Sequence, residues 1–437
     1  MKKKAALHNL GCKVNAYETE VMEQHLKEAG YEIVPFEPGA DVYVINTCTV
    51  TNIADRKSRQ MLHRARKMNP DAIVVAAGCY VQASQEAAAV DPAIDIVLGN
   101  NRKNELVEVI RQFEEKKQAE KSIDVTDLTH SREYESTFLA STQEHTRAYL
   151  KVQDGCNQFC SYCIIPYARG RVRSRNLQET VEEVRSLAAS GCQEIVLTGI
   201  HLSSYGVDTG SSLLELIQAV HEVDGISRIR LGSLEPGIIT EEFASKLAAL
   251  PKMCPHFHLS LQSGCDATLK RMNRKYTAAQ YAEKCRILRS VFNRPALTTD
   301  VIVGFPGETE EEFAATVEFL KEISFYETHI FKYSRRQGTR AAVMPDQIPE
   351  QIKAKRSEIL ISLGDANRKK FEESWQGQQA EVLMEEKITL NGKDYYTGYT
   401  KEYLKTVIPA DQEYTNIKVT GSIGQEVAPH IYLIKKI

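Results

Sequence analysis

Short apolar runs alternate with amphipathic stretches along most of this 437-residue chain, and no other feature constrains its fold as strongly. Strands that alternate with helices predict a parallel sheet with helices on both faces. We therefore expect an α/β chain whose first domain, residues 1–117, is a doubly wound parallel sheet. Its predicted strands are Ala5–Asn9, Asp41–Asn46, Ala72–Ala77 and Ile94–Leu98, and its predicted helices include Tyr17–Glu28 and Asp55–Lys67.

The same alternation returns in the middle of the chain. Residues 118–146 are polar and are interpreted as a linker, and residues 147–375 then repeat the strand–helix pattern six times. Six such units predict a partial (βα)6 barrel with its chemistry at the carboxyl ends of the strands. A helix with an apolar stripe is predicted to close this domain, and its apolar residues are Ile348, Ile352, Ile359, Leu360 and Leu363. The six strands are predicted at Ala148–Val152, Glu194–Thr198, Arg228–Ser233, Phe257–Gln262, Leu297–Val303 and Tyr326–Tyr333.

Residues 376–437 change character and predict a small β-barrel of about five strands. Small barrels of this type often bind nucleic acid through lysine and aromatic side chains. The candidates here are Tyr395, Tyr396, Tyr399, Lys401, Tyr403 and Lys405, although alternating tyrosine is also common in ordinary β-structure. The strands are predicted at Glu381–Glu385, Tyr395–Tyr399, Leu404–Ile408, Asn416–Val419 and Glu426–Leu433.

The composition is that of an ordinary globular protein, with 42% hydrophobic and 26% charged residues. No apolar run reaches the length of a membrane span, and no signal-peptide pattern follows the basic start, so we expect a cytoplasmic protein without a membrane partner. Ten cysteines in such a chain indicate metal or redox chemistry. The net charge of -3 argues against a uniformly basic nucleic-acid binder but is compatible with local basic patches.

Three of the cysteines, Cys156, Cys160 and Cys163, form a C-x3-C-x2-C motif with no fourth cysteine nearby. A cubane iron–sulfur cluster normally takes four cysteine thiolates. Three thiolates leave one iron open, and an open position is where a catalytic metal centre receives its substrate. A structural zinc site needs a fourth ligand at finger-like spacing, which the sequence lacks. The motif therefore predicts a catalytic cluster.

Cys12, Cys48 and Cys79 are far apart in the sequence, but each follows a predicted strand of the first domain. Parallel strands of a doubly wound sheet share the edge that holds their carboxyl ends, so the three thiols can meet there. A second three-cysteine cluster is the prediction, and buried free cysteines are the alternative. The other four cysteines show no ligand spacing and are interpreted as structural: Cys192, Cys254, Cys265 and Cys285.

The whole chain resembles the radical-SAM methylthiotransferases, and its C-terminal barrel resembles a TRAM domain. The marks of the resemblance are Leu10–Asn15 (LGCKVN), Asn46–Cys48 (NTC), Gly155–Gly170 around the cysteine motif, and Thr299–Glu312 (TDVIVGFPGETEEE). The Cys12-Lys13-Val14-Asn15 run and the segment after Cys163 are similar to the branch that acts on N6-threonylcarbamoyladenosine in tRNA. The branch that acts on isopentenyladenosine usually has Gln-Met before that asparagine.

This resemblance implies methylthiolation of adenosine C2 at position 37, in the anticodon stem-loop of tRNA. No side-chain acid or base can activate that C–H bond, so cofactors carry the step. They would be two [4Fe-4S] clusters and two molecules of S-adenosylmethionine (SAM). The cluster of Cys156, Cys160 and Cys163 donates an electron to SAM, whose cleavage gives the radical that activates C2. The cluster of Cys12, Cys48 and Cys79 carries the sulfur, and a second SAM supplies the methyl group. An electron donor and a sulfur or cluster-assembly source are the further partners.

Contacts to the cofactor and the RNA are expected near the same strand ends. The residues expected to bind SAM are Thr198, Gly199, Ser233, Glu235, Gln262, Ser263 and Gly304, although each is compatible with an ordinary β-to-α turn. Basic runs near the strand ends predict phosphate contacts, although such runs are commonly just solvated surface. These arginines are Arg169, Arg171, Arg173, Arg175, Arg271, Arg274, Arg335 and Arg336.

Three alternatives remain compatible with the sequence. The first is the same chemistry on another tRNA adenosine or on a ribosomal-protein aspartate. The second is a non-enzymatic RNA-binding iron–sulfur protein that senses redox state. The third is a thiol oxidoreductase that uses Cys160 and Cys163, in which Cys156 would be surplus.

Overall fold

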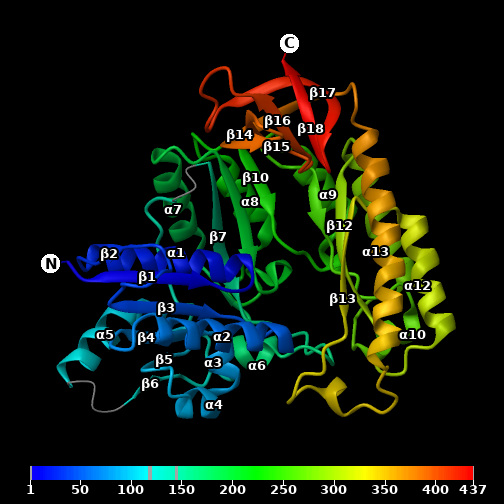
Figure 1. The fold of residues 1–437 in the computed structure, drawn as a ribbon. Coiled ribbons are helices and arrows are strands. Elements are labelled where there is room, and N and C mark those ends of the chain that lie inside the picture. Colours follow the sequence, from blue (N-terminus) through cyan, green and yellow to red (C-terminus); the bar gives the residue numbers. More distant parts are fainter. Residues whose placement is uncertain (1, 117–120, 143–145, 437) are drawn as a thin grey trace.

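The computed structural model describes residues 2–116, 121–142 and 146–436, and Figure 1 shows the arrangement of these residues. An N-terminal sheet layered with helices lies against a central set of parallel strands, and a small β-barrel covers one end of those strands. The boundary predicted between residues 117 and 118 lies outside the described residues. The predicted α/β class and its three types of architecture are confirmed.

The N-terminal sheet has six strands, all of them parallel. Apolar residues of α1 and α5 pack on one face and those of α2, α3 and α4 on the other, as expected for a doubly wound sheet. In spatial order the strands are β2 (Glu32–Ile33), β1 (Lys4–Asn9), β3 (Val42–Thr47), β4 (Ile73–Gly78), β5 (Ile96–Leu98) and β6 (Ser122–Asp124). The helices are α1 (Lys13–Glu28), α2 (Asn52–Met68), α3 (Cys79–Ala83), α4 (Gln85–Val90), the 3-10 turn η1 (Lys103–Glu105) and α5 (Leu106–Glu115).

Two strands of this sheet were not predicted. β2 has only two residues, too few to show an alternating pattern. β6 lies in the polar segment interpreted as a linker, yet its backbone pairs with β5 at the sheet edge. An edge strand needs backbone hydrogen bonds more than apolar side chains, so its composition gave little signal.

All six strands predicted for the central region are present and run parallel. Together with a seventh strand that was not predicted, the short antiparallel β8, they form two sheets, β10-β9-β7-β8 and β11-β12-β13. Short bridges from Ile229 to Met253 and from Leu234 to Leu259 connect the two sheets into a partial barrel. The strands are β7 (Arg147–Asp154), β8 (Arg173–Ser174), β9 (Glu194–Gly199), β10 (Arg228–Leu231), β11 (His256–His258), β12 (Ala296–Val303) and β13 (Glu327–Lys332).

Alternate residues of these strands point to opposite faces, so each strand contributes both to the helix-covered core and to an opposite face. On β12, Leu297, Val301 and Val303 belong to the core, whereas Thr298 and Asp300 lie on the other face, here called the inner face. The covering helices are α7 (Leu177–Ala189), α8 (Leu213–His221), α9 (Glu241–Ala248), α10 (Asp266–Arg271), α11 (Ala278–Val291), α12 (Glu310–Ile323) and α13 (Glu350–Glu373).

The closing helix α13 is present, but only part of its predicted apolar stripe is buried. Leu360 is fully buried and Leu363 packs against the core, whereas Ile352 and Ile359 are 37% and 42% exposed. Lys353 and Arg356 of the same helix are buried. The buried cations have partners in the barrel, because Arg356 pairs with Glu308 at 2.7 Å and Lys353 donates to the Tyr333 carbonyl at 3.0 Å. Polar contacts of buried cations therefore orient this helix together with the predicted apolar contacts of Leu360 and Leu363.

The C-terminal barrel closes from five strands, as predicted, in the order β14-β15-β16-β18-β17. The last two predicted strands had wrong limits, because the observed turn between β17 and β18 lies near His430, inside the predicted fifth strand. The strands are β14 (Gln379–Leu390), β15 (Lys393–Thr400), β16 (Lys405–Pro409), β17 (Lys418–Ala428) and β18 (Ile431–Lys436).

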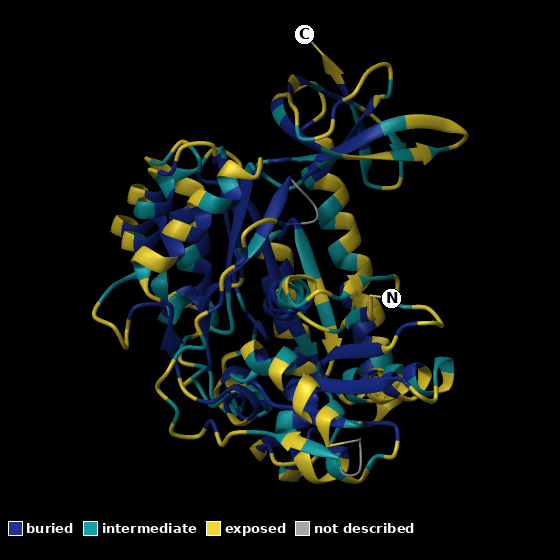
Figure 2. Cartoon of the chain, turned by 90° about the vertical axis from the view of Figure 1, so that its left-hand side faces the viewer, coloured by how far each residue is buried: buried dark blue, intermediate teal, exposed yellow. Residues whose placement is uncertain are grey.

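One contact between these regions positions the site. Tyr17 and Val21 of α1 join the core of the central region, so α1 lies beside β7. Figure 2 shows that most of the central strands are buried and that exposed residues lie mainly on the outer helices, loops and C-terminal barrel, whereas the residues of β13 are intermediate or exposed. Among the described residues, no helix combines the length and the apolarity that crossing a membrane requires.

Candidate active site

The C-x3-C-x2-C motif forms a loop directly after β7. Gly155 has a φ of 73°, and a Cβ there would lie 1.8 Å from the Arg171 carbonyl oxygen, so only glycine allows this close approach. Backbone bonds fix the loop: Cys156 N donates to the Gly170 carbonyl and Ser161 N to the Met272 carbonyl, both at 3.0 Å. The fold thereby holds the three thiols at the carboxyl end of the barrel.

A chain of polar contacts joins this loop to the ends of two strands. Arg274 donates to Cys160 Sγ at 3.2 Å and pairs with Glu235 at 2.8 Å. Glu235 follows β10, and its carboxylate also lies 3.7 Å from Nε2 of His201, which follows β9. Of the residues predicted to bind SAM, Glu235 is therefore the one that the structure links to the cysteine loop.

The other residues predicted to bind SAM have different surroundings. Thr198 and Gly199 end β9, and Ser233 is exposed after β10, so all three lie at the expected strand ends. Gln262 has a φ of 73° and bridges to β12. One prediction needs correction, because the Ser263 hydroxyl is fully buried 3.2 Å from Thr316 on α12 and supports the fold. Gly304 packs against Lys353 on α13, and its contact with SAM stays a prediction.

The second cysteine set meets at the carboxyl edge of the N-terminal sheet, as the topology predicted. Cys12, Cys48 and Cys79 directly follow the adjacent strands β1, β3 and β4 or the short loops after them. A Cβ on Gly11 would lie 3.0 Å from Cys48 Sγ, so the loop bearing Cys12 reaches Cys48. Burial, together with smaller contributions from the neighbouring Cys79 and Cys12 sulfurs, raises the pKa of Cys48 to about 11.

The short helix α6 (Ile165–Arg169) connects the two cysteine sets. It begins two residues after Cys163 and ends at Arg169, whose Nε donates to Cys79 Sγ at 3.2 Å. Arg169 is fully buried and also donates to Glu18 at 2.6 Å and to Asp154 at 3.1 Å. Each cysteine set therefore has one sulfur that accepts a hydrogen bond from a guanidinium group.

Arg169 belongs to a buried group of ion-paired side chains between α1, β7 and α6. The group holds four cations and two carboxylates: Lys103, Lys151, Arg169 and Arg173 with Glu18 and Asp154. Its excess of positive charge lies against Cys79. Buried charge without compensation is costly, and metal-bound thiolates at this edge would compensate it.

The donor sets fit iron–sulfur clusters. Each set offers three thiols, and thiolates are the usual ligands of such clusters. Burial raises the pKa of Cys156 to about 11 and of Cys163 to about 12, so a bound metal would have to supply the charge that keeps them deprotonated. Among the described residues, the ligand atoms of His258, Asp300 and His329 all lie within 4.8 Å of one another. The three sulfurs of neither cysteine set meet this limit. The wider spacing of the sulfurs suits a multi-iron cluster better than a single ion.

Comparison with known proteins agrees with this geometry. The profile of the Radical SAM superfamily matches residues 150–320, and that of Uncharacterized protein family UPF0004 matches residues 4–99. The threonylcarbamoyladenosine tRNA methylthiotransferase MtaB of Bacillus subtilis (strain 168) is 43% identical over 411 residues, which cover 93% of this chain and 91% of that protein. This chain belongs to the radical-SAM methylthiotransferase family. It is therefore an enzyme that methylthiolates tRNA with the aid of SAM and iron–sulfur clusters.

Two further comparisons place this methylthiotransferase in a wider group. The tRNA-2-methylthio-N(6)-dimethylallyladenosine synthase of Pelotomaculum thermopropionicum is 35% identical over 391 residues, which cover 88% of this chain and 87% of that protein. The structure of the radical SAM methyltransferase TsrM from Kitasatospora setae, with cobalamin and a [4Fe-4S] cluster bound, aligns with a TM-score of 0.58 and 18% identity. The alignment covers 78% of this chain and 74% of TsrM and supports the fold.

Several arginines predicted to contact RNA lie inside the methylthiotransferase. Arg169, Arg173 and Arg175 are at most 1% exposed, and Arg175 pairs with Glu183. Arg336 is buried against Asp55, and Arg274 is bonded to Cys160 and Glu235. These five side chains are not available to phosphates, because their charges are already paired within the protein. Of the remaining three, Arg271 pairs with Glu312, whereas Arg171 and Arg335 are exposed.

The tyrosines of the C-terminal barrel also differ from the prediction. Tyr399 and Tyr403 stack with their centroids 4.6 Å apart, and Arg147 lies 5.2 Å from each ring. Lys401 donates to the Pro251 carbonyl at 2.9 Å. These three barrel residues therefore hold the barrel against the central strands and do not form a nucleic-acid surface.

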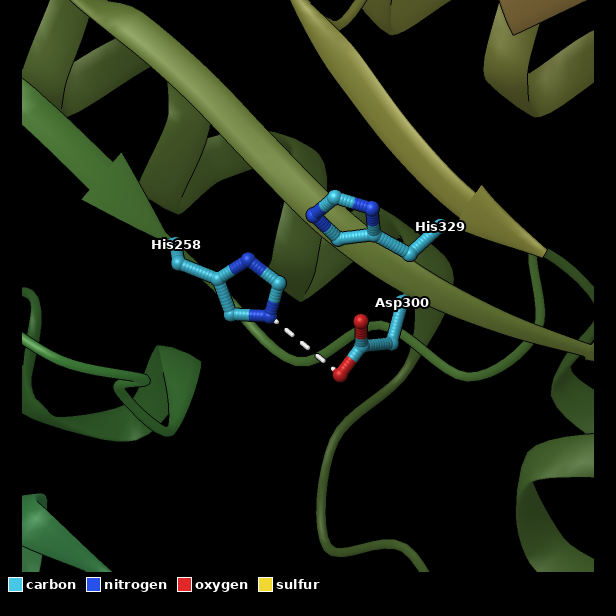
Figure 3. A group of neighbouring side chains, drawn as sticks. All are labelled: His258, Asp300 and His329. Carbon is cyan, nitrogen blue, oxygen red and sulfur yellow. Dashed lines mark ion pairs between the residues drawn. The ribbon is translucent and has the colours of Figure 1, made fainter. Parts of the chain in front are cut away.

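The inner face carries a group of polar side chains that the sequence did not reveal (Figure 3). His258 on β11, Asp300 on β12 and His329 on β13 point toward one another. His258 Nε2 lies 3.3 Å from Asp300, and the rings of His258 and His329 stack with centroids 5.7 Å apart. Each residue looks isolated in the sequence, because only strand pairing brings the three together. The weak signal was the alternation of polar with apolar residues on each strand.

Proposed function

We propose that this methylthiotransferase acts on C2 of N6-threonylcarbamoyladenosine at position 37 of tRNA, with two SAM molecules and two [4Fe-4S] clusters. The observation that carries the choice of substrate is the polar inner face of the barrel. His258 and His329, with the cation Lys13 nearby, can receive a charged substituent. An isopentenyl group would need an apolar pocket, and a site built for polar contacts discriminates strongly against an apolar analogue.

We assign one cluster to Cys156, Cys160 and Cys163 and the other to Cys12, Cys48 and Cys79. When bound, the first supplies the electron that cleaves SAM, and the second carries the sulfur. Arg274 and Arg169 donate to one sulfur in each set and hold the ligand loops in place. Glu235 and the β9 end at Thr198 and Gly199 are the best placed of the predicted SAM contacts.

The assignment of domains follows from these roles. We propose that residues 1–117 carry the sulfur-donating cluster and that residues 147–375 carry the radical chemistry. Residues 376–437 form the small β-barrel that covers one end of the central strands, and residues 118–146 connect the first two regions. Arg171 and Arg335 are the exposed arginines that we assign to tRNA phosphates. None of the ten cysteines forms a disulfide, which fits the proposed cytoplasmic location, where an electron donor and a sulfur source would be available.

The substrate assignment is tested by reaction of the reduced, reconstituted enzyme with SAM, a sulfur source and two anticodon stem-loop RNAs. One RNA carries threonylcarbamoyladenosine at position 37 and the other isopentenyladenosine. Mass analysis of the nucleosides should show the methylthio product on the first RNA. Product on the second RNA alone would refute the substrate and leave the radical chemistry intact.

The cluster assignment is tested by iron content. The intact chain should bind about eight irons, and triple alanine variants of either cysteine set should bind about four and lose methylthiolation. Reductive cleavage of SAM should disappear only in the Cys156, Cys160 and Cys163 variant. Unchanged iron in the Cys12, Cys48 and Cys79 variant would contradict the second cluster.

A further inference from the structure

Lys13 is a cation between the two cysteine-bearing regions. It is the first residue of α1, directly after Cys12, and its Nζ lies 6.0 Å from the ring of Tyr149 on β7. Its side chain is exposed to solvent, and over the described parts of the chain no carboxylate lies within 4.0 Å of its Nζ. Lys103 and Lys151, the nearby buried lysines, both pair with Glu18. Within the part of the chain that the structure describes, Lys13 thus differs from them in lacking an acidic partner.

The surroundings of Lys13 are unfavourable for an unpaired cation. Arg147 and Arg230 act on it with like charge, and the nearby carboxylate, Glu194, is already bonded to both arginines. Lys13 also stands at the positive end of the α1 dipole, in a first turn without acidic residues. An anion bound beside Lys13 would relieve each of these repulsions.

The proposed substrate brings such an anion to this place. The urea N–H of the threonylcarbamoyl group can donate to adenine N1, because the two close a six-membered ring. The threonine carboxylate then extends along the Watson–Crick edge, on the side of C2. C2 must approach the sulfur held at Cys12, Cys48 and Cys79, and Lys13 is the residue next to Cys12.

We propose that Lys13 binds the threonine carboxylate and makes this enzyme specific for an N6 substituent that carries a negative charge. The inference rests on the proposed function, because it requires threonylcarbamoyladenosine as the substrate. A lysine ammonium can donate a charge-assisted hydrogen bond to a carboxylate, which is roughly twice as strong as a neutral one. Lys13 is thus a residue that determines specificity, distinct from the cysteines that hold the clusters.

The test compares two stem-loop RNAs that differ in one group: the threonine carboxylate or its neutral carboxamide. The wild-type enzyme should prefer the acid in kcat/KM by about ten- to a hundredfold, the range expected for a charge-assisted bond. Lys13→Met should lower kcat/KM on the acid by the same ten- to hundredfold and leave kcat/KM on the amide unchanged. Lys13→Arg should keep most of the preference, because the charge remains. Lys27→Met, at the exposed far end of α1, is the matched control and should behave as wild type.

Iron content and cluster absorbance of each variant report whether the site at Cys12 is intact. An equal loss on both RNAs in Lys13→Met would show a structural role and overturn the proposal. Equal wild-type rates on acid and amide would overturn it without any variant. Product from isopentenyladenosine RNA but from neither threonylcarbamoyl RNA would instead refute the proposed function, and this inference with it.

Discussion

Replacement of Glu18 by glutamine tests whether the buried ion group holds the N-terminal sheet against the barrel. Glu18 lies on α1 and is 3% exposed. Its carboxylate accepts from Lys151 at 2.8 Å, from Arg169 at 2.6 Å and also from Lys103. These cations hold its pKa well below the usual range despite the opposing effect of burial. Glutamine keeps the shape and removes the charge, which leaves Asp154 as the one carboxylate of the group.

The expected cost follows from the number and burial of these bonds. Removal of one partner from a buried ion pair typically costs about 3–5 kcal/mol, because the remaining charges are left without compensation. Three cations lose a partner here, so we expect the effect to reach that range. For a folding unit of about 150–250 residues, 1 kcal/mol shifts the unfolding midpoint by about 2–4 °C. The transition that involves the N-terminal sheet should therefore fall by about 6–20 °C.

Differential scanning calorimetry of the metal-free chain measures this shift. Glu28→Gln, on the exposed last turn of the same helix, is the matched control and should shift the midpoint by no more than a degree or two. Lys103→Met added to Glu18→Gln should recover part of the loss, because it removes one unpaired cation. A Glu18→Gln midpoint that matched that of Glu28→Gln would refute the argument that this group supports the interface.

Two further predictions concern the base of the barrel. Burial alone would raise the pKa of Glu194, but Arg230 and Arg147 lower it to about 2. The pKa of a glutamate in the unfolded chain is about 4.3. The contribution of the charged Glu194 to stability is therefore complete above about pH 4.3 and is lost as the pH falls through about 2. The difference in stability between wild type and Glu194→Gln, measured by thermal melts, should shrink steadily as the pH falls from about 4.3 to about 2. A difference independent of pH would contradict the lowered pKa of Glu194. Truncation after residue 375 removes Glu381 and Glu385, which pair with Arg228 and Arg147. The truncated chain should unfold at a lower temperature than the intact chain. An unchanged unfolding midpoint would show that the C-terminal barrel does not stabilise the central strands.

Local pattern was enough to predict most of the strands and the places where the cysteines would gather. Cys12, Cys48 and Cys79 could be placed at one edge because each follows a strand of a parallel sheet, and parallel strands end at a common edge. Strand limits were less predictable at sheet edges, as β6 and the β17–β18 turn show, because backbone pairing there depends on neighbouring strands.

The fate of the charged residues could not be predicted in the same way. Arg169, Arg173 and Arg175 form a basic run of the kind expected on a surface, yet Glu18 on α1, Asp154 on β7 and Glu183 on α7 draw them into the interior. His258, Asp300 and His329 likewise become a group only through strand pairing.

The sequence by itself determined the order of strands and helices, the two cysteine sets and the family. Apolar periodicity and ligand spacing are local properties that a single segment carries in full. Tertiary structure alone decided which charges are buried, which arginines remain at the surface and what the inner face presents to the substrate. The reason is physical: the free energy of a charged side chain depends on its partners and on the water it loses, and segments far away in the chain set both.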